Sequence, residues 1–566
     1  MKKILKDPTY KNTTGYNGLD LSSIQNFSSS CGHIIPVTWD FLQPGDKVKV
    51  GELLRTRTTP LISASYAEIK EHVRWFFVPM NQIYKPFGDL FHGIQDLPSD
   101  FYTTIIDSPA RVNNLLPSIS LGDLIVNVLI EPLKTGSQNP SDEFFRRARL
   151  LECMGIPVQR ILTYNFAEPG LDTWKQHKVN LLPFLAYQKI WFDYFRDSDR
   201  FANDPLAYNL DSWIDVQSQT LTQARLNKIF KLQNCPLYRD TMNNLLVSPL
   251  FGEQGVGGIS VGTLSKVNNW LTDQEPFVKN QTRGNTTTPT QVSIGNVTSA
   301  AYVSTATIRS AFAVDKLLEI TRRAKKHFDA QTLAHFGVEV PMGLDGECID
   351  IHHHESSLII GDVVSSADTE GAPLGEIAGK GYNSDTSRDS SFEAKSHGVL
   401  MCVYYSKPVI NYLQQGIDKK FLYTLVSDFP REEFENLGNQ PVFLLNQQLN
   451  PEQVNNSQIQ GWQYRYQEVK SQFNRVITGL ARGLSSWCVN RGQYYKNADD
   501  FYCQPTQINN LLVQPYFEDI VAQVADPFYT AIDLNTSLFD SDPLVHQLKL
   551  NYRKATKLST YGISQI

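Results

Sequence analysis

The C-terminal run LVHQLKLNYRK (544–554) alternates apolar and polar residues more cleanly than any other part of this 566-residue chain. Leu548, Leu550 and Tyr552 fall on one face of this run, and Gln547, Lys549, Asn551 and Arg553 fall on the other. Because successive residues of a strand point to opposite faces, the pattern predicts a half-buried β-strand. A strand so late in the sequence needs partners from distant segments, so the sheet must be closed by long-range pairing.

The expected partner strands form two well-separated groups. Strand-like runs bounded by Pro, Gly, Asp or Ser occupy residues 33–42, 47–56, 73–79 and 398–406. Greek-key sandwiches and jelly rolls are closed by such distant pairings. We therefore expect a mainly β fold in which 1–566 is one domain and large loop insertions account for the length. The insertions are expected at 252–306, which is rich in Gly, Thr and Asn, and similarly at 362–394.

Two segments carry a helical period. In 183–197 an aromatic-rich stripe recurs at helical spacing and is expected to face the core, and its members are Tyr187, Ile190, Trp191, Tyr194 and Phe195. In 307–338 a second apolar face is formed by Val314, Leu317, Leu318, Ala324 and Phe328. Gly337 stands where the second helix is expected to stop.

Composition limits the classes of function. With 41% hydrophobic and 19% charged residues, the chain is that of a folded protein. A net charge of −6 argues against a surface that binds nucleic acid everywhere but permits a local basic patch. The seven cysteines are scattered without a C-x-x-C pair, which is typical of a reducing compartment. No signal-peptide core and no apolar stretch of about 18 residues is present, so we expect neither secretion by that route nor membrane insertion.

Three consecutive histidines in ECIDIHHHESSLII (347–360) raise the question of a metal site. On a strand, Asp350, His352 and His354 would face one way and His353 and Glu355 the other. A cupin would follow its H-x-H pair with a glutamate, where this chain has Leu358 and Ile359. We therefore expect no metal ligands and no cofactor here. The motifs H-E-x-x-H and G-x-x-x-x-G-K-[ST] are also absent, and no catalytic residues are expected.

Several sequence segments, in order along the chain, resemble segments of one protein family. They are SCGHIIPVTWDFLQPGDKVKVGELLRTRTTPL, VRWFFVPMNQIY, LPFLAYQKIWFDYFRD, LLEITRRAKKHFDAQTLAHFGV, GEIAGKGY, SHGVLMCVYY, GWQYRYQEVKSQFNRVITGL and LKLNYRKATKLSTYGI. Together they resemble the major capsid proteins of microviruses, the small icosahedral single-stranded DNA bacteriophages, in the style of the gokushovirus-like branch. The resemblance implies an eight-stranded viral jelly roll with long loop insertions and a few helices. It also implies self-assembly into an icosahedral shell that encloses a circular single-stranded DNA genome and contributes to host attachment.

The same resemblance implies partners and a location. The partners would be further copies of the chain, the DNA genome, internal scaffolding, basic packaging and DNA pilot proteins, and a host surface receptor. The chain would be found in the virion, and in the host cytoplasm during assembly. Residues 252–306 would form a surface protrusion or an intersubunit insertion. Where the family commonly has two glycines in its second helix, this chain has Ala324 and Lys325, so we expect that helix to continue unbroken.

The best candidate for DNA contact is the C-terminal segment NYRKATKLSTYG. We predict that Arg553, Lys554, Lys557 and Tyr552 bind nucleic acid on the inner surface of the shell, because cations beside aromatic rings suit single strands. A competing basic cluster at 322–326 is expected to be solvated or to face another subunit. Two readings from other classes stay open at this point: a cupin-like metal-dependent enzyme and a carbohydrate-binding β-sandwich.

Overall fold

The computed structural model describes most of the sheet and helix framework of the chain. The described residues are 15–59, 68–92, 116–130, 142–158, 177–198, 201–211, 221–240, 328–340, 346–364, 377–413, 416–435, 438–447, 459–482 and 542–558, with isolated positions between them. The insertion expected at 252–306 lies outside these residues.

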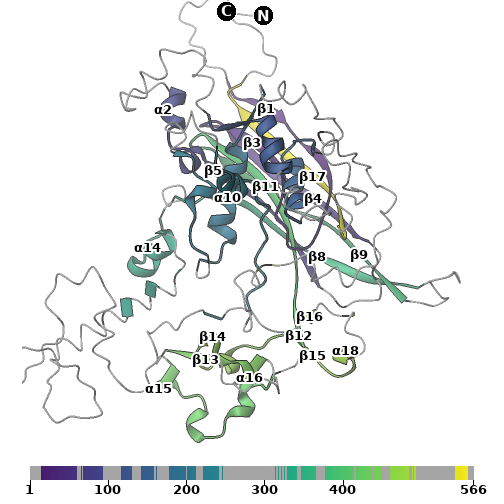
Figure 1. Cartoon of the computed structure of the whole chain (residues 1–566), viewed down its shortest axis with the longest axis vertical. Coiled ribbons are helices and arrows are strands. Elements are labelled where there is room, and N and C mark those ends of the chain that lie inside the picture. The colour runs from purple at the N-terminus through teal and green to yellow at the C-terminus, as the bar shows by residue number, and fades with distance from the viewer. Residues whose placement is uncertain are drawn as a thin grey trace, which may run out of the picture.

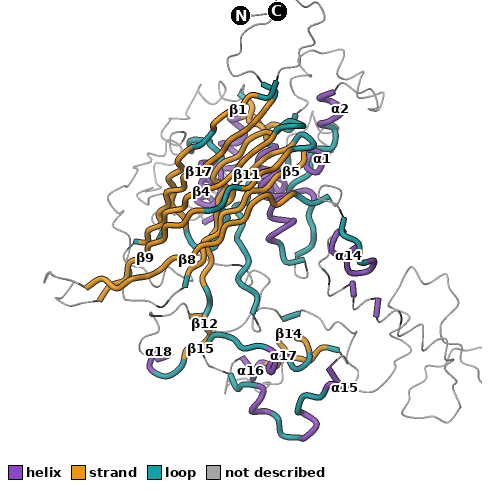
Figure 2. Tube along the Cα trace, turned by 180° about the vertical axis from the view of Figure 1, so that it is seen from behind, coloured by secondary structure: helices purple, strands orange, loops and turns teal. Residues whose placement is uncertain are grey.

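Two antiparallel layers of strands face each other (Figures 1 and 2). One layer has the order β3 (Ile35–Leu42), β11 (Gly398–Pro408), β5 (Ile69–Pro79), β8 (Ile349–Val364). In the other, β1 (Asn17–Asp20) and β2 (Ser23–Ser29) pair with β17 (Leu544–Thr556), followed by β4 (Lys47–Thr58) and β9 (Ile377–Thr386), while β10 (Ser390–Glu393) also pairs with β4. The first part of β8 pairs with β5 and its end pairs with β9, which joins the layers. This is the expected jelly roll, closed by the C-terminal strand.

The predicted strands and the alternation of β17 are confirmed. All five runs are strands, and in β17 the side chains of Leu548, Leu550 and Tyr552 are buried while those between them are exposed or half-buried. The expectation of irregular chain at 362–394 is wrong, because β9 and β10 lie there. A strand containing Gly, Asn and Ser gives a weak sequence signal. Its glycine is required at position 381, where a Cβ would lie 2.5 Å from Thr58 Cγ2.

Buried carboxylates lie between the two layers. Glu71 on β5 accepts hydrogen bonds from Thr56 Oγ1 at 2.6 Å, Tyr404 Oη at 2.7 Å and Asn383 Nδ2 at 2.5 Å. These donors come from β4, β11 and β9, so one side chain connects strands of both layers. A buried carboxylate needs such partners to offset the loss of water. Burial nevertheless raises the pKa of Glu71.

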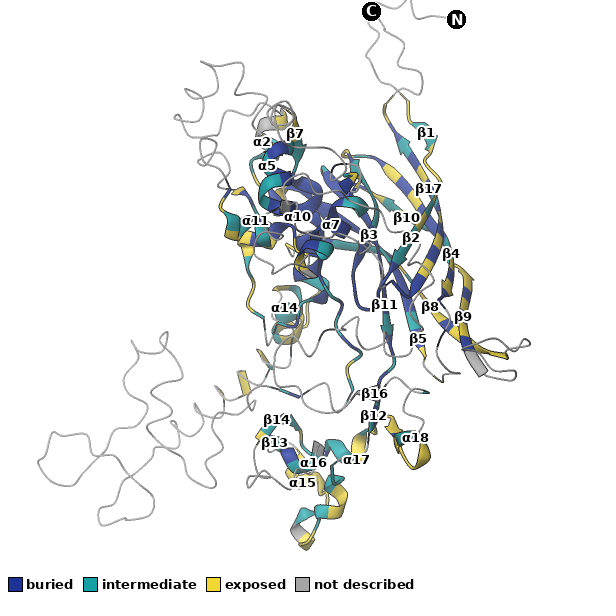
Figure 3. Cartoon of the chain, turned by 45° about the vertical axis from the view of Figure 1, so that its right-hand side comes forward, coloured by how far each residue is buried: buried dark blue, intermediate teal, exposed yellow. Residues whose placement is uncertain are grey.

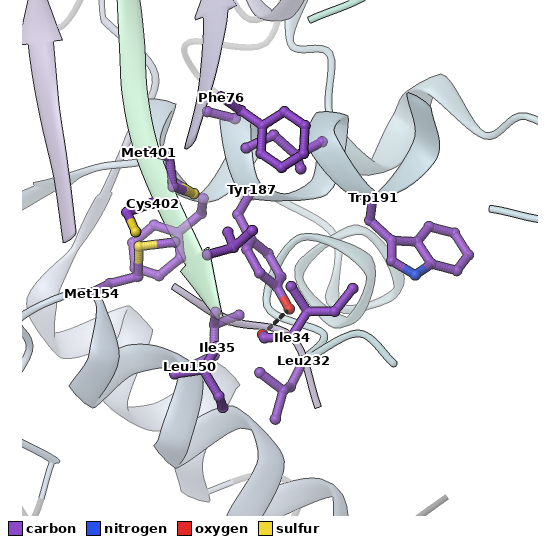
Figure 4. Close-up of a cluster of buried hydrophobic side chains, with 14 of the residues drawn as sticks. Ile34, Ile35, Phe76, Leu150, Met154, Tyr187, Trp191, Leu232, Met401 and Cys402 are labelled. Atoms are coloured by element: carbon purple, nitrogen blue, oxygen red, sulfur yellow. Dashed lines mark hydrogen bonds between the residues drawn. The ribbon is translucent and has the colours of Figure 1, made fainter. Parts of the chain in front are cut away.

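Helices cover the far face of the β3–β11–β5–β8 layer (Figure 3). They are α7 (Asp142–Cys153), α10 (Leu182–Ile190) and η2 (Trp191–Phe195). The aromatic stripe predicted at 183–197 is packed in the core, and Tyr187 Oη donates a hydrogen bond to Ile34 O at 2.8 Å (Figure 4). Among the described residues, no helix covers the outer face of the β17–β4–β9 layer, which is largely exposed along alternate residues (Figure 3).

The expectation of one unbroken helix over 307–338 is wrong. The helix α14 covers only Phe328–Phe336, and Ala324 is in a bend. Gln331 Nε2 donates to Thr321 O at 2.9 Å. In a continuous helix these residues would be about 15 Å apart along the axis, so the chain must turn back between them. Gly337, with φ 69°, ends α14 as predicted.

The remaining elements are short. Around the sandwich they are α1 (Met80–Ile83), α2 (Phe87–His92), β6 (Ser118–Ser120), α5 (Leu121–Leu124), η1 (Ile125–Ile130), β7 (Lys178–Asn180), η3 (Pro205–Ala207) and α11 (Gln223–Ile229). A small lobe follows β11 (Figure 1) and contains β12 (Asn411–Leu413), η5 (Lys419–Leu422), η6 (Val426–Asp428), α15 (Glu432–Glu435), β13 (Asn439–Phe443), α16 (Leu444–Gln447), β14 (Ile459–Tyr464), α17 (Gln467–Lys470), β15 (Arg475–Val476), α18 (Gly479–Arg482) and β16 (Asn490–Arg491). Among the described residues, no helix is both long and apolar enough to span a membrane.

Candidate nucleic-acid interface

The four residues predicted to bind DNA do not share one surface. Arg553 and Lys557 are exposed, whereas Tyr552 and Lys554 are buried. The strand alternation is the cause, because positions 552 and 554 lie on the same face of β17 as Leu548 and Leu550. The structure therefore brings only Arg553 and Lys557 to the exposed side.

Tyr552 and Lys554 are held by carboxylates inside the fold. Tyr552 Oη donates to Asp40 Oδ2 at 2.6 Å, and Lys554 Nζ lies 3.0 Å from the same oxygen. Lys554 Nζ also donates to Phe41 O at 2.7 Å and lies 3.5 Å from Asp46 Oδ2. Burial and the nearby Asp40 raise the pKa of Tyr552. Both side chains are thus committed to connecting β17 with the end of β3.

Cations line the exposed face of the neighbouring strands β4 and β17. We call it the basic face, and its members are Lys47, Lys49, Arg55, Arg57, Lys549 and Arg553. The strand register places Arg553 opposite Lys49, Gln547 opposite Arg55 and Val545 opposite Arg57. Residues two apart on a strand are about 6.8 Å apart, so the cations form two rows on neighbouring strands. Such a surface can contact successive phosphates of an extended strand.

A shallow groove lies at one end of the basic face, where β1, β17, β4 and β10 meet. It encloses about 650 Å³, and its lining includes Lys47, Lys49 and Arg553 as well as Asp20 and Glu393. Lys49 Nζ lies 2.9 Å from Asp389 Oδ2, and its hydrogen bond lowers the pKa of that carboxyl group. Lys47 and Glu393 are farther apart, at 3.8 Å, and both are exposed. Exposed pairs of this kind are weak, so phosphate groups can compete for the lysines.

An aromatic ring stands beside this groove. Tyr16 is 50% exposed, and the Nζ atoms of Lys47 and Lys557 lie 5.7 Å and 5.9 Å from its ring centroid. A cation beside an open aromatic face is the arrangement expected for stacking a base while holding its phosphate. The sequence prediction assigned that role to Tyr552, whereas the structure gives Lys557 a different aromatic neighbour from the other end of the chain.

The other end of the basic face carries Arg55, Arg57 and Lys549. Within the described part of the chain, no carboxylate lies at ion-pair distance from Arg55, Arg57 or Lys549. This face was not among the sites predicted from the sequence, although KVKVGELLRTRT places cations at alternate positions of a predicted strand. That alternation was the available signal.

The triple histidine does not form the cupin-type pair. His352 points between the layers, where its Nε2 lies 3.0 Å from Glu52 Oε1 and its Nδ1 lies 2.7 Å from Ser390 Oγ. His353 points to the opposite face, as predicted. Asp350 was expected beside His352, but the register of β5 and β8 shifts at Ile351 and turns Asp350 toward Arg74. The shift is a β-bulge, which inserts one residue and reverses the facing of those before it.

Comparison with known proteins identifies one family and one relative that match most of the chain. The sequence model of a family described as "Capsid protein (F protein)" matches residues 168–527. Capsid protein VP1 of Bdellovibrio phage phiMH2K is 23% identical over 496 residues, which cover 80% of this chain and 81% of that protein.

Proposed function

The chain belongs to the F-type phage capsid protein family and has the role of a major capsid protein, and we propose that its basic face binds the packaged single-stranded DNA. The observation that carries the proposal is a sheet face that no described helix covers, with exposed cations at alternate positions of β4 and β17. The chain as a whole has a net charge of −6, so these cations are not the product of a generally basic composition.

The basic face suits a strand of any sequence. Guanidinium and ammonium groups on a rigid sheet contact phosphates, which are the same at every nucleotide. The exposed Tyr16 ring offers a stacking surface, and every base has a face that can stack. We therefore expect DNA binding with little sequence preference and a strong dependence on salt. The basic face would then line the inside of the shell.

Paired substitutions test the proposal. The double variant Arg55→Gln/Arg57→Gln removes two exposed cations that form no ion pair with any described carboxylate. The double variant Arg553→Gln/Lys557→Gln removes the two exposed cations predicted from the sequence. Each should leave assembly intact and reduce retained DNA. The slope of log binding constant against log salt should become shallower by about 1.4, because each lost contact to a single strand contributes about 0.7.

A matched control separates local contact from net charge. Lys228→Gln/Lys470→Gln removes the same charge from side chains that are each 43% exposed and lie elsewhere. This control should retain DNA like the unchanged chain. Equal DNA content and an equal dependence of DNA release on salt in all three variants would contradict DNA binding by the basic face.

Self-assembly is supported by apolar side chains that no described residue covers. In the small lobe they are Phe421 (81% exposed), Val426 (75%), Leu425 (63%) and Phe429 (58%). Four such side chains expose on the order of 500 Å² of apolar surface, comparable with the largest patches found on monomers, which are often functional. We propose that a neighbouring copy covers them, and that each subunit buries well over 2,000 Å² in total, as obligate interfaces do. A native particle in which this patch is open to solvent would contradict the proposal.

The shell would act together with the partners that the resemblance implies, namely scaffolding, basic packaging and DNA pilot proteins and a host receptor. We further propose that 252–306 projects from the particle and contributes to host attachment. Deletion of 281–298 should preserve particles and impair adsorption. Loss of particles would instead assign the segment to contacts between subunits.

A further inference from the structure

His72, His353 and Glu355 bring three metal-ligating side chains together on one face of the β5–β8 pair. In the antiparallel register Glu355 lies opposite His72, and His353 lies opposite Arg74. His353 and Glu355 are two residues apart on β8 and therefore point the same way. One ligand atom from each of the three side chains lies within 4.8 Å of the other two.

The separations fit a single ion. His72 Nδ1 lies 3.0 Å from His353 Nε2 and 3.8 Å from Glu355 Oε2. In a tetrahedral site with bonds of about 2.0–2.1 Å, the donor atoms are about 3.3 Å apart. The two measured distances lie on either side of that value. In this structure a hydrogen bond joins the two imidazoles. A small rotation of the rings would direct both nitrogen lone pairs at a metal ion, and the proton of the hydrogen bond would be released when the ion binds. We propose that these three residues bind Zn²⁺, with water in the fourth position.

The surrounding groups fix the ligands in useful orientations. His72 Nε2 is hydrogen bonded to Tyr238 Oη at 2.7 Å, which leaves Nδ1 directed toward His353. The His72 ring is also stacked on Tyr405, with ring centroids 4.7 Å apart. Lys70 Nζ lies 3.1 Å from Glu355 Oε1, so the other carboxylate oxygen faces His72. Partners of this kind are typical around metal ligands, because they select the tautomer and hold the ring.

Three cations lie around the ligands and set the expected strength of binding. Arg74 is paired with Asp350, Lys70 with Glu355, and Lys407 Nζ lies 4.1 Å from the centroid of the Tyr238 ring. Their charges weaken attraction for a divalent ion, so we expect micromolar rather than nanomolar affinity.

The donor set favours zinc over the common hard cations. Two imidazoles and one carboxylate suit Zn²⁺, whereas Ca²⁺ and Mg²⁺ prefer oxygen ligands in larger numbers. His353 and Glu355 are exposed, so an ion can enter from solvent. Because the ligands come from two strands, a bound ion would connect β5 with β8. Zinc should therefore stabilise this layer of the capsid protein against heat.

The test is titration of the full chain with ZnCl₂ after treatment with EDTA. Isothermal titration calorimetry should show a micromolar site with one ion per chain, and the thermal midpoint should rise with zinc. His353→Ala should weaken this site about 100-fold and Glu355→Gln at least about tenfold, while Tyr238→Phe should weaken it about tenfold through the lost contact to His72. The first two substitutions are at exposed positions, so the variants should fold. Co²⁺ in place of zinc should give the intense visible absorption of a tetrahedral site.

The neighbouring histidine supplies the control. His354 belongs to the same triple but its Nε2 lies 3.5 Å from Asp385 on β9, away from His72. His354→Ala should bind zinc and cobalt like the unchanged chain. Absence of the site in the unchanged chain, or the same affinity in His353→Ala and His354→Ala, would overturn the proposal.

Discussion

Lys554 provides the sharpest test of how β17 is oriented, because its sequence neighbourhood and its structural environment predict different phenotypes. A lysine that binds DNA should be dispensable for folding. In the structure its Nζ instead lies 3.0 Å from Asp40 and 3.5 Å from Asp46, and it donates to Phe41 O at 2.7 Å. We therefore expect Lys554→Gln to destabilise the fold.

The magnitude follows from what the substitution leaves behind. Removing one partner of a buried ion pair costs about 3–5 kcal/mol, because the other charge stays buried. The Asp46 side chain is only 3% exposed, but Asp40 is 32% exposed and keeps its hydrogen bond from Tyr552. The lower end, about 3 kcal/mol, is therefore expected. For a single domain of 566 residues, an unfolding entropy of about 2.1 cal/mol/K per residue gives a shift of roughly 0.8 °C in melting temperature per kcal/mol, so the expected shift is about 2–3 °C.

Calorimetry of the full-length chain, together with the DNA content of assembled particles, would measure the effect. Arg553→Gln is the matched control, since it makes the same charge change at the adjacent exposed position and should alter stability by less than about 0.5 kcal/mol. The reasoning is refuted if Lys554→Gln melts like the unchanged chain but retains less DNA. That result would mean that Lys554 reaches the nucleic acid.

Three further outcomes follow from the core. Burial lowers the pKa of His546 to about 3, which is below its value in the unfolded chain. The stabilisation that the neutral imidazole gives to the folded state is therefore complete above about pH 6.5 and decreases by about 1.4 kcal/mol per pH unit as the pH falls toward 3. The free energy of unfolding of His546→Gln should accordingly depend less on pH in acid. Gly398→Ala should lower urea stability by about 1–3 kcal/mol, because the new Cβ would lie 2.3 Å from the ring of Phe77. Trp75→Phe removes the donor that lies 3.1 Å from the buried Glu52 carboxylate and should cost about 1–3 kcal/mol in thermal unfolding.

Much of the sandwich was predictable because its strands are amphipathic or strongly apolar. The alternation of 544–554 indicated both the strand β17 and its buried face. The strand β9 was missed because Gly379, Gly381 and Ser384 carry little strand propensity, and its place is set by pairing with β4 and β8. The break before α14 had no local signal either, since Ala324 is a good helix former. The turn is marked instead by contacts of Thr321 with side chains of α14.

The candidate site was predictable only in part, and for a geometric reason. Arg553 and Lys554 were predicted to share one DNA-binding patch because they are adjacent in sequence. Adjacent residues of a strand, however, face opposite sides of the sheet. Applying the alternation to those two residues, and to Lys47, Lys49 and the arginines of β4, would have selected the basic face. Tyr16 could not have been found in this way, because its place beside Lys557 depends on the pairing of β1 with β17.

The charge of the basic face limits what it can do for a packaged genome. Among the described residues, its six cations lie beside three carboxylates, Asp20, Asp389 and Glu393, which leaves a surplus of three positive charges. A single strand brings one negative charge per nucleotide, so this surplus neutralises only about three nucleotides per subunit. Any larger share of the genome must be neutralised by charges outside the basic face, such as counterions or a separate basic protein. If the basic face lines the inside of the shell, as we propose, the sheet is therefore better suited to fixing the path of the strand than to condensing it.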